Sequence, residues 1–570
     1  MIKQKIRALV LDSIKALGFP SDTNFEILTP KPGFGDFSSN AALILAKQQG
    51  TSPREMADAL LEAITKHTPS AIDRIEIAGP GFINFFLAES FYTDITARIL
   101  GAGDTWGSNQ ELTGKKIMIE YTDPNPFKPF HIGHLMTNAI GESLSRIVEA
   151  SGAHLVRANY QGDVGLHVAK AIWALGGEGL PDKSLPVQEQ AEYIGRCYVL
   201  GSRAYEDNLE AKAEIDVINK KVYTREDEVI NEIYDWGREI TLEAFEAIYK
   251  KLGTHFNYYF FESEMAIIGE KIVRANIGKV FTESNGAIVF HGENYDPKLH
   301  TRVFISSQGL PTYEGKELGL VMTKFEKENP DVSITVTANE QAEYMRVVTK
   351  AVEQLEPSIA PRMHHICHGM MRLEAGKMSS RKGNVVTGES LLKDSYEEVY
   401  EKVLERDYSQ ELKESIATTV SVAALKYSIL KPAMGGDITF DFERSISFEG
   451  DSGPYLQYAA IRARSILNKA AEAGLAPSAD SRKGHEVTPL ERELFRFEDV
   501  VFRAGKEYEP HHIVTFLTDL SAAFNQFYGA GQIVDAANLA APYKLALTHA
   551  FYITLNNGLK LLGISLPEKM

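Results

Sequence analysis

The sequence is poor in cysteine and has no long hydrophobic run: its 570 residues include only Cys197 and Cys367. Two cysteines cannot form a disulfide framework, which points to a reducing compartment. No apolar stretch approaches the roughly 18 residues that a membrane-spanning helix needs. The N-terminal stretch alternates charged with apolar residues, includes Asp12 and is unlike a secretory signal. We therefore expect a cytoplasmic protein with no membrane association.

Basic residues are too few for binding to nucleic acid through overall charge. Lysine and arginine number 60 against 77 aspartates and glutamates, which gives a net charge of −17. This balance opposes purely electrostatic binding, although a local basic groove can coexist with it. Hydrophobic residues make up 44% and charged residues 24% of the chain, which excludes wholesale disorder and fibrous repeats. At about 150 residues per domain, the length predicts three or four domains.

Hydrophobic periodicity divides the chain into three parts. Helical and β-like patterns indicate a small α+β domain over residues 1–107. Strand, helix and strand patterns over 116–160 predict a βαβ unit, and hence a parallel sheet in an α/β domain over residues 108–395. A charge-rich helical stretch at about 185–280 indicates an insertion into that domain. Residues 396–570 are almost entirely helical in pattern.

The first motif that carries chemistry is PNPFKPFHIGH at 124–134, between a predicted strand and a predicted helix. Pro129 fixes the backbone before the helix, and Gly133 leaves room for a ligand. His131 and His134 are three residues apart and share one helix face. A helix start favours anions, so the motif suits a triphosphate. The alternatives are a helix start that happens to carry two histidines, or a metal site without its third and fourth ligands.

The second motif is GKMSSRKGN at 376–384. Its three cations, Lys377, Arg381 and Lys382, lie among small residues. Such a loop can close over phosphates and stabilise the charge that develops during displacement. Taken alone the motif is weak evidence, because most basic loops rich in glycine and serine are simply solvated.

Together the two motifs resemble the HIGH and KMSKS motifs of class I aminoacyl-tRNA synthetases, and the flanking segments resemble the arginyl-tRNA synthetase family over nearly the whole chain. The matching segments are GDFSSNAA (35–42), PGFINFFL (80–87), NYQGDVG (159–165), LPTYEGKELG (310–319), SISFEGDSGPYLQYAAIRAR (445–464) and NNGLKLLGISLPEKM (556–570). The resemblance implies a Rossmann-like parallel-sheet catalytic domain with a helical insertion. It also implies a small α+β N-terminal domain that contacts tRNA and an all-α C-terminal anticodon-binding domain.

The reaction that the resemblance implies is the ligation of L-arginine to tRNA(Arg). The carboxylate of arginine attacks the α-phosphorus of ATP bound to Mg²⁺, which gives arginyl-adenylate and pyrophosphate. The arginyl group then passes to the 2′-hydroxyl of the terminal adenosine of the tRNA. The family also implies a monomer. Two alternatives remain open: a class I synthetase for another amino acid, and a non-catalytic tRNA-binding paralogue. A non-synthetase nucleotidyltransferase would leave the N-terminal and C-terminal domains unexplained.

For ATP, the resemblance implies that His131 and His134 contact the phosphates, that Gly133 allows close approach of the adenosine and that Lys377 stabilises pyrophosphate. The predicted ATP-binding set is Pro129, His131, Gly133, His134, Lys377, Met378 and Ser379. Ser380 stands where the second lysine of the KMSKS motif would be. We hypothesise that Lys128, three residues before His131, supplies the missing cation and acts in catalysis with His131, His134 and Lys377.

For arginine, the resemblance implies that Glu120 and Asn125 flank the α-amino group and that Tyr313 and Glu317 lie beside the guanidinium. A guanidinium forms paired hydrogen bonds with carboxylates, and residues four apart share a helix face. Without the surrounding match, Glu317 would be interpreted as a surface residue near a packed tyrosine. Gln341 is a further predicted contact.

Three positions in the predicted arginine site depart from the family pattern. Glu317 stands where the family usually has aspartate, and Val164 where it usually has tryptophan. The segment TANEQAE at 337–343 replaces the usual family sequence, so Glu340 competes with Gln341 for the predicted contact. The shape of the pocket therefore remains open.

For tRNA, the resemblance implies that Phe82 and Asn84 contact a nucleotide in the elbow, although Phe82 could equally be a core residue. Unpaired anticodon bases need aromatic surfaces and cations. The predicted C-terminal contacts are Tyr455, Gln457, Tyr458 and Arg462. Some of these residues could pack between helices instead.

The segment HHICH at 364–368 suggests metal ligands but lies in a predicted strand. Side chains alternate along a strand, so His364 and His368 point away from His365 and Cys367. Four ligands cannot converge from one strand, and the sequence predicts no metal site.

Overall fold

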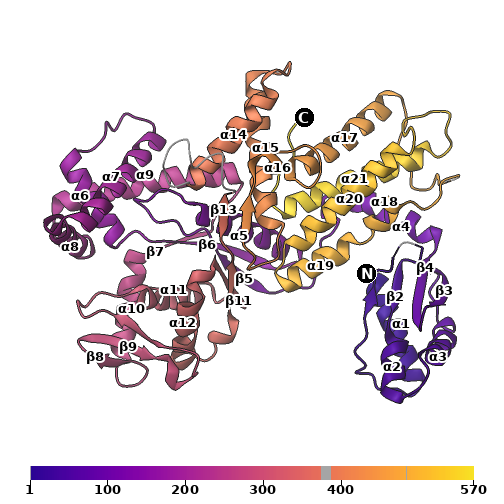
Figure 1. Cartoon of the computed structure of the whole chain (residues 1–570), viewed down its shortest axis with the longest axis horizontal. Coiled ribbons are helices and arrows are strands. Elements are labelled where there is room, and N and C mark those ends of the chain that lie inside the picture. Colours follow the sequence, from indigo (N-terminus) through magenta and orange to yellow (C-terminus); the bar gives the residue numbers. More distant parts are fainter. Residues whose placement is uncertain (1, 32, 374–386, 483) are drawn as a thin grey trace. The chain divides into compact units, whose positions relative to one another are not determined.

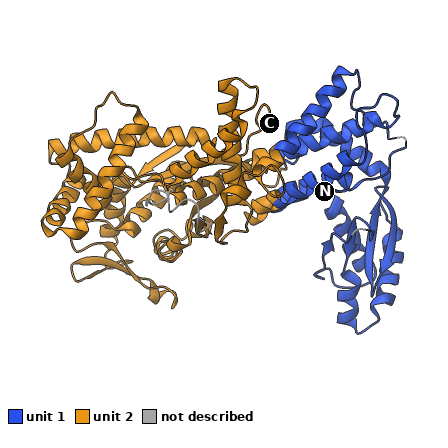
Figure 2. Cartoon of the chain, turned by 45° about the horizontal axis from the view of Figure 1, so that its top comes forward, with its two compact units in different colours: residues 1–108, 458–503, 515–558 blue, residues 109–457, 504–514, 559–570 orange. Residues whose placement is uncertain are grey.

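The structure is a computed structural model that describes residues 2–31, 33–373, 387–482 and 484–570. The chain divides into two compact units (Figure 2). Unit 1 consists of Met1–Ser108, Tyr458–Arg503 and Thr515–Gly558, and unit 2 of Asn109–Gln457, Ala504–Val514 and Leu559–Met570. Among the described residues, no helix is both long and apolar enough to cross a membrane.

A five-stranded parallel sheet forms the centre of unit 2, which confirms the predicted parallel sheet (Figure 1). Its strands are, in spatial order, β12 (Met363–His368), β11 (Val332–Ala338), β5 (Lys116–Glu120), β6 (His154–Gln161) and β7 (Tyr258–Phe261). All four pairings are parallel. The carboxyl ends of the central strands therefore meet at one edge, where ligands bind in open α/β sheets.

Helix α5 (Ile132–Ala150) follows β5 and is buried on nearly every side. Fourteen of its nineteen residues are buried, including polar residues such as Asn138 and Glu142. The helix packs on β5, β6 and β11 and is covered by α14 (Gly388–Leu404) and α15 (Gln410–Leu430). The sequence predicts one apolar side for this helix, but the structure encloses its polar side as well.

The stretch predicted as a helical insertion at about 185–280 is not helical throughout. It contains α7 (Val187–Asp207), α8 (Leu209–Thr224), α9 (Glu228–Leu252), β7 and α10 (Glu262–Ala275). The first three helices pack with α6 (Leu166–Glu178) around an apolar core. Strand β7 interrupts the helices because its aromatic residues pair with β6 and complete the central sheet.

A second layer of unit 2 follows in sequence. Strands β8 (Thr282–Ser284), β9 (Ala287–His291) and β10 (Thr301–Ile305) form an antiparallel sheet. Helices α11 (Tyr313–Glu328) and α12 (Ala342–Leu355) share a hydrophobic core with it. Helix α11 thus begins near the small sheet, and one of its faces lies along α10.

Unit 1 contains the predicted α+β module. Its sheet has the order β1 (Ile27–Leu28), β2 (Phe37–Ser39), β4 (Phe82–Leu87) and β3 (Ile72–Ala78), and its helices are α1 (Ile2–Ala16), α2 (Ala41–Gln49), α3 (Pro53–Thr65) and α4 (Glu89–Ala102). Buried Asp36 accepts hydrogen bonds from the Leu87 amide at 2.8 Å and the Tyr92 hydroxyl at 2.5 Å, and it pairs with Arg492. This carboxylate joins the module to α18 (Pro489–Leu494) within the unit.

The all-α prediction for the C-terminal part is confirmed except for one short strand, β14 (Ile438–Phe440), which pairs with β13 (Met371–Leu373). The helices after α15 are α16 (Phe442–Ser445), α17 (Gly453–Glu472), α18, α19 (Phe497–Glu507), α20 (His511–Gly529) and α21 (Ala541–Leu561). The contact-based division differs from the predicted boundary at residue 396. Helices α14 and α15 pack on α5 and so belong to unit 2.

The close approach of α5 to β5 yields a stability prediction. A Cβ atom added to Gly141 would lie 2.2 Å from the Tyr121 ring, so Gly141→Ala should lower the free energy of unfolding of unit 2 by about 1–3 kcal/mol. Gly176 on α6 is exposed, and a Cβ atom added there would meet no other atom within 4 Å, so Gly176→Ala should raise stability by about 0.5–1 kcal/mol. Denaturant titration followed by circular dichroism measures both changes. Equal effects of the two variants would contradict the packing argument.

Candidate active site

Two stacked histidines begin helix α5. His131 is the N-cap residue, and its Nδ1 accepts a hydrogen bond from the Gly133 amide at 3.1 Å. The Nδ1 of His134 accepts from the His131 amide at 3.3 Å, and the two rings lie 3.6 Å apart at 27°. Because each Nδ1 is an acceptor, each neutral ring carries its proton on Nε2. The pair therefore presents two Nε2–H donors at a helix N-terminus.

The surroundings keep both rings neutral. Burial lowers the pKa of His134 well below its usual value, and the neighbouring His131 and Lys128 lower it further. Desolvation and the charge of Lys128 also lower the pKa of His131. Neutral imidazoles with their protons on Nε2 donate hydrogen bonds without adding charge, which suits contacts with phosphate oxygens.

Lys128 lies in the turn before α5 and is half-buried. Its Nζ is 5.5 Å from the centre of the Tyr198 ring on α7. Desolvation, followed by the charge of Lys170, lowers the pKa of Lys128. The ammonium group lies near enough to the histidines to affect both of their pKa values, as its hypothesised role requires.

The other predicted ATP-binding residues are only partly described. Pro129 is half-buried and packs against Gly195 of α7. Lys377, Met378 and Ser379 lie outside the described residues, and their predicted roles stay predictions.

Between β5 and α5, three residues other than glycine have positive φ. They are Thr122 at 81°, Asp123 at 46° and Phe127 at 67°. A β-branched residue such as threonine rarely takes this conformation, which costs on the order of 1–3 kcal/mol per residue. Such strain persists only where the surrounding contacts enforce it, and it is typical of functional sites.

Four carboxylates gather at the carboxyl end of β5, and we call them the acidic cluster: Glu120, Asp123, Glu262 and Glu317. Glu120 and Glu317 are buried, at 2% and 4% exposure. Glu120 pairs with the buried Lys324, and Glu262 pairs with Lys316 at 2.6 Å.

Within the described part of the chain, two carboxylates of the acidic cluster, Asp123 and Glu317, have no ion-pair partner of their own. Burial and then the charge of Glu120 raise the pKa of Glu317 to about 8. Burial and Glu120 also raise the pKa of Asp123 well above its usual value. Among the described residues, Oε1 of Glu317 has no hydrogen-bond partner. An uncompensated buried carboxylate is stabilised by an incoming cation, so the cluster favours a ligand with two positive groups.

Four of the five residues predicted to bind arginine lie around the acidic cluster. Glu120 and Glu317 belong to it. A Cβ atom at Gly162 would lie 2.2 Å from Oδ1 of Asn125 and 3.4 Å from Cδ of Glu262, so Asn125 borders the cluster. Tyr313 begins α11, and its largely exposed ring lies 5.3 Å from Nζ of Lys316, which pairs with Glu262.

The fifth residue, Gln341, is exposed, as is its competitor Glu340. Both lie in a short 3₁₀ helix, Asn339–Gln341, directly after β11. They are therefore at the same edge of the sheet as the acidic cluster. Gln341 stays a predicted contact.

Sequence reasoning missed several residues of the site. They are Asp123, Tyr160, Glu262, Lys316, Lys324 and Tyr344, all of which interact electrostatically with the acidic cluster. One signal could have found Lys324, because it lies two helical turns after Glu317 and therefore on the same face of α11. Asp123 directly precedes the motif at 124–134 but has no distinguishing spacing.

Val164 lies outside the acidic cluster. It is buried at 2% exposure in the apolar core of the helical insertion, together with Phe127. Val164 is a packing residue. Its departure from the family pattern therefore changes the apolar core that holds Phe127, in the turn before α5.

Two of the predicted tRNA contacts have buried side chains, and their roles stay predictions. Asn84 is buried at 3% exposure, and its Oδ1 accepts a hydrogen bond from Ser38 at 2.6 Å. Gln457 is completely buried, and its amide donates to the Ser565 carbonyl at 2.6 Å. Both side chains serve the interior of their own unit because the local strand or helix turns them inward. Phe82 is half-buried and remains a candidate.

The other predicted contacts on α17 are accessible. Tyr455, Tyr458 and Arg462 are spaced three and four residues apart and share a helix face. The Arg462 guanidinium lies 4.7 Å from the Tyr458 ring centre and 5.2 Å from that of Tyr528, and it donates to Asn525 at 3.0 Å. An arginine held between two aromatic rings provides the stacking surface and charge that unpaired bases need.

The segment HHICH forms β12, as the alternation predicts. His365 and Cys367 share a face, with Sγ 3.6 Å from Nδ1, and His365 also contacts the Thr337 hydroxyl at 2.7 Å. Within the described parts of the chain, no three or more His, Cys, Asp or Glu side chains are grouped as metal ligands would be.

Three family models match the chain. The model for class I tRNA synthetases (R), catalytic domain, matches residues 97–442, and the DALR anticodon binding domain matches 456–570. The arginyl tRNA synthetase N terminal domain matches 4–87. The three matches follow one another along the chain in the order that the sequence predicts.

Curated relatives match over almost their whole length. An arginine–tRNA ligase of Clostridium perfringens is 32% identical over 554 residues, covering 95% of each chain. One from Thermococcus sibiricus is 30% identical over 611 residues, covering 95% of this chain and 94% of its own.

Solved structures show the same fold. The Thermus thermophilus arginyl-tRNA synthetase aligns with a TM-score of 0.82 at 24% identity, covering 100% of both chains. The Plasmodium falciparum arginyl-tRNA synthetase aligns with a TM-score of 0.79 at 19% identity, covering 100% of this chain and 99% of its own.

Proposed function

Because the chain belongs to the arginyl-tRNA synthetase family of class I, we propose that the acidic cluster binds arginine and that the start of α5 binds ATP. The enzyme is an arginine–tRNA ligase that uses ATP. The observation that carries the residue assignments is that the uncompensated Asp123 and the two neutral histidines follow one another between β5 and the start of α5, with the uncompensated Glu317 of α11 near Asp123.

The charges of arginine match those that the acidic cluster lacks. The amino acid has two cationic groups, and Asp123 and Glu317 are the two carboxylates without a lysine of their own. We assign the guanidinium to Glu317 and Tyr313, and the α-ammonium to Glu120 and Asn125 together with the neighbouring Asp123. A guanidinium also offers a planar set of donors for the unpartnered Oε1 of Glu317.

ATP binds with its phosphates at the N-terminus of α5. The Nε2–H groups of His131 and His134 donate to phosphate oxygens, and Gly133 lets the nucleoside approach the backbone. Lys128 adds a cation, and Lys377, Met378 and Ser379 complete the site by family resemblance. Mg²⁺ arrives bound to the phosphates as part of the substrate.

The first step is an in-line displacement. The arginine carboxylate attacks the α-phosphorus, and the bond to pyrophosphate breaks while cations and Nε2–H donors stabilise the developing negative charge. No protein nucleophile is needed, so the rate depends on how the two substrates are positioned. The arginyl group then passes from the adenylate to the 2′-hydroxyl of the terminal adenosine.

The proposed tRNA contacts are Phe82 in unit 1 and the face of α17 that carries Tyr455, Tyr458 and Arg462. Aromatic rings interleaved with a guanidinium support this assignment. The monomeric state and the cytoplasmic location remain predictions from the sequence.

Amino-acid-dependent ATP–pyrophosphate exchange, with and without tRNA, tests the function. Exchange with arginine alone among the twenty amino acids supports it. Exchange with another amino acid would point to a class I synthetase of different specificity. Folded protein that binds tRNA but catalyses no exchange would point to the non-catalytic paralogue.

Arginine binding should release protons at pH 7. Glu317, with a pKa of about 8, is about nine-tenths protonated at pH 7. A bound guanidinium lowers that pKa, so the proton leaves, and arginine affinity rises as the pH increases towards 8. Calorimetric titration in buffers of different ionisation enthalpy should show about one proton fewer released by Glu317→Gln than by the wild type. Equal release by the two proteins would contradict the assignment.

Lys128→Ala should slow adenylate formation by about 100- to 1,000-fold, since loss of one group that stabilises transition-state charge has this effect. Lys128→Arg should retain more of the rate. Lys170→Ala removes a neighbouring cation from α6 and should stay within about threefold of wild type. Rapid-quench measurement of adenylate gives all three rates, and an unchanged rate in Lys128→Ala would refute the role of this lysine.

Binding of tRNA should weaken steeply with salt. Because the net charge is −17, binding must come from a local positive surface, and each phosphate that is neutralised adds about 0.9 to the slope of log affinity against log salt. Fluorescence titration over a range of about 50 to 200 mM salt measures that slope. Affinity that does not change with salt would contradict a phosphate-binding surface.

A further inference from the structure

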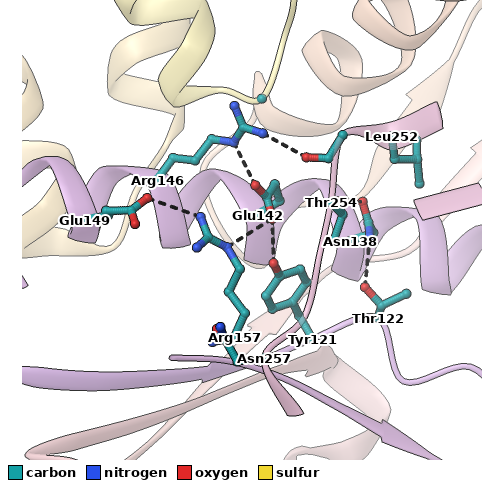
Figure 3. A network of polar contacts seen from close by, with 12 residues as sticks. Tyr121, Thr122, Asn138, Glu142, Arg146, Glu149, Arg157, Leu252, Thr254 and Asn257 are labelled. Carbon is teal, nitrogen blue, oxygen red and sulfur yellow. Dashed lines mark hydrogen bonds and ion pairs between the residues drawn. The ribbon is translucent and has the colours of Figure 1, made fainter. Parts of the chain in front are cut away.

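Two buried polar side chains of α5, Asn138 and Glu142, form hydrogen bonds with the segment between β5 and the turn that precedes α5 (Figure 3). Nδ2 of Asn138 donates to the Thr122 hydroxyl at 3.0 Å, and its Oδ1 accepts from the Thr254 hydroxyl at 3.0 Å. One turn later, the Glu142 carboxylate accepts from the Tyr121 hydroxyl at 2.6 Å. The hydrogen bonds from Asn138 and Glu142 therefore involve two consecutive residues, Thr122 and Tyr121, of the segment that connects β5 to α5.

Glu142 is itself held from two further directions. Nε of Arg146 lies 2.7 Å from one carboxylate oxygen, and Nε of Arg157 lies 3.5 Å from the other. Arg146 also donates to the Gly253 carbonyl at 2.8 Å, at the end of α9. Figure 3 shows Glu142 between the two guanidinium groups, with the Tyr121 ring on its other side. A carboxylate paired on three sides has little freedom to move, and neither has its hydroxyl partner.

The segment that these side chains hold is Tyr121–Asp123, which we call the connector. Thr122 and Asp123 have positive φ, and Thr122 is buried at 1% exposure. The Thr122 carbonyl also accepts a weaker bond from the Thr137 hydroxyl at 3.4 Å. A strained threonine keeps this conformation only because the bonds around it exclude the alternatives.

The connector stands between the two proposed substrate sites. Glu120 precedes it, Asp123 ends it, and the histidine pair follows eight residues later at the start of α5. His134, Asn138 and Glu142 are spaced four residues apart, so they lie along one face of α5. One rigid helix therefore carries the proposed ATP site at its first turn. On its next two turns it carries Asn138 and Glu142, which bond to the connector beside the proposed arginine site.

We propose that Asn138 and Glu142 are positioning residues that fix the connector, and thereby set the distance between the arginine carboxylate and the α-phosphorus of ATP. This inference rests on the proposed function. A shift of about 1 Å between bound reactants can cost about 100-fold in rate. Neither residue touches a substrate, so both act through Tyr121 and Thr122.

A purely structural role does not account for the arrangement as well. Burying the Glu142 carboxylate, the Arg157 guanidinium and the Asn138 amide carries a large desolvation cost, and apolar side chains of similar size would pack without it. Hydrogen bonds differ from apolar packing because they fix direction. The polar atoms of Asn138 and Glu142 form hydrogen bonds with the strained connector. The directions of these bonds determine the positions of Glu120 and Asp123, which flank or end the connector.

The test removes each hydrogen bond by changing its connector residue, Thr122 or Tyr121, and leaves the residues of α5 unchanged. Thr122→Val keeps the shape of the side chain but loses the hydroxyl that Asn138 binds, and Tyr121→Phe loses only the hydroxyl that Glu142 binds. Each variant should slow single-turnover adenylate formation at saturating arginine, ATP and tRNA by about 10- to 100-fold. The KM values for arginine and ATP should stay within about threefold, because the contacts with each substrate are intact. Thr122→Ser keeps the hydroxyl and should restore the rate to within about threefold of wild type.

Ser143→Ala is the matched control. Ser143 is also fully buried on α5, but its hydroxyl donates to the Leu561 carbonyl at 3.0 Å, away from the connector. This variant should lose stability, as measured by its unfolding midpoint, and keep the wild-type rate.

The proposal is overturned if Thr122→Val and Tyr121→Phe keep the wild-type rate, if their losses appear only in KM, or if Ser143→Ala loses as much rate as they do. An absence of arginine activation in the wild type would instead refute the proposed function.

Discussion

The burial of α5 on nearly every side is the constraint on which the rest of the structure depends. A helix with one exposed face can leave its polar side chains in water, but α5 lies between the sheet and the covering helices α14 and α15. Most of its polar side chains are therefore buried and need partners within the protein. Asn138 and Glu142 find theirs on the connector, and the histidines of the first turn find theirs in backbone amides. The hydrogen bonds of one buried helix thus reach the residues of both proposed substrate sites.

The same low-dielectric interior explains the charge of the acidic cluster. Two lysines on α11 neutralise two carboxylates, and the remaining two are destabilised as anions, which is why the pKa values of Asp123 and Glu317 are raised. At the proposed arginine site, the substrate would supply the missing cations. The neutral state of the histidines follows from the same burial, with Lys128 adding to it. The two sites therefore differ in charge although one short segment joins them.

Patterns that depend on local spacing could be predicted from the sequence. The parallel sheet and the helix start at His131 follow from periodicities of two and of 3.6 residues. Partnerships between distant segments could not be predicted in this way. Lys324 looks like a solvated helix residue until Glu120 is placed beside it. Polarity alone also does not show that Asn84 and Gln457 are buried and have partners inside the protein.

The choice of threonine at position 122 connects these points. Glycine would adopt the positive φ of the connector without strain, and the segment would then depend less on its neighbours for its shape. Threonine adds strain, but it also adds a hydroxyl for Asn138 and a side chain that is fully packed. A glycine connector would be free to relax, whereas this one holds its shape only while α5 holds it. The strained residue thus makes the position of the arginine site depend on the helix that begins at the ATP site.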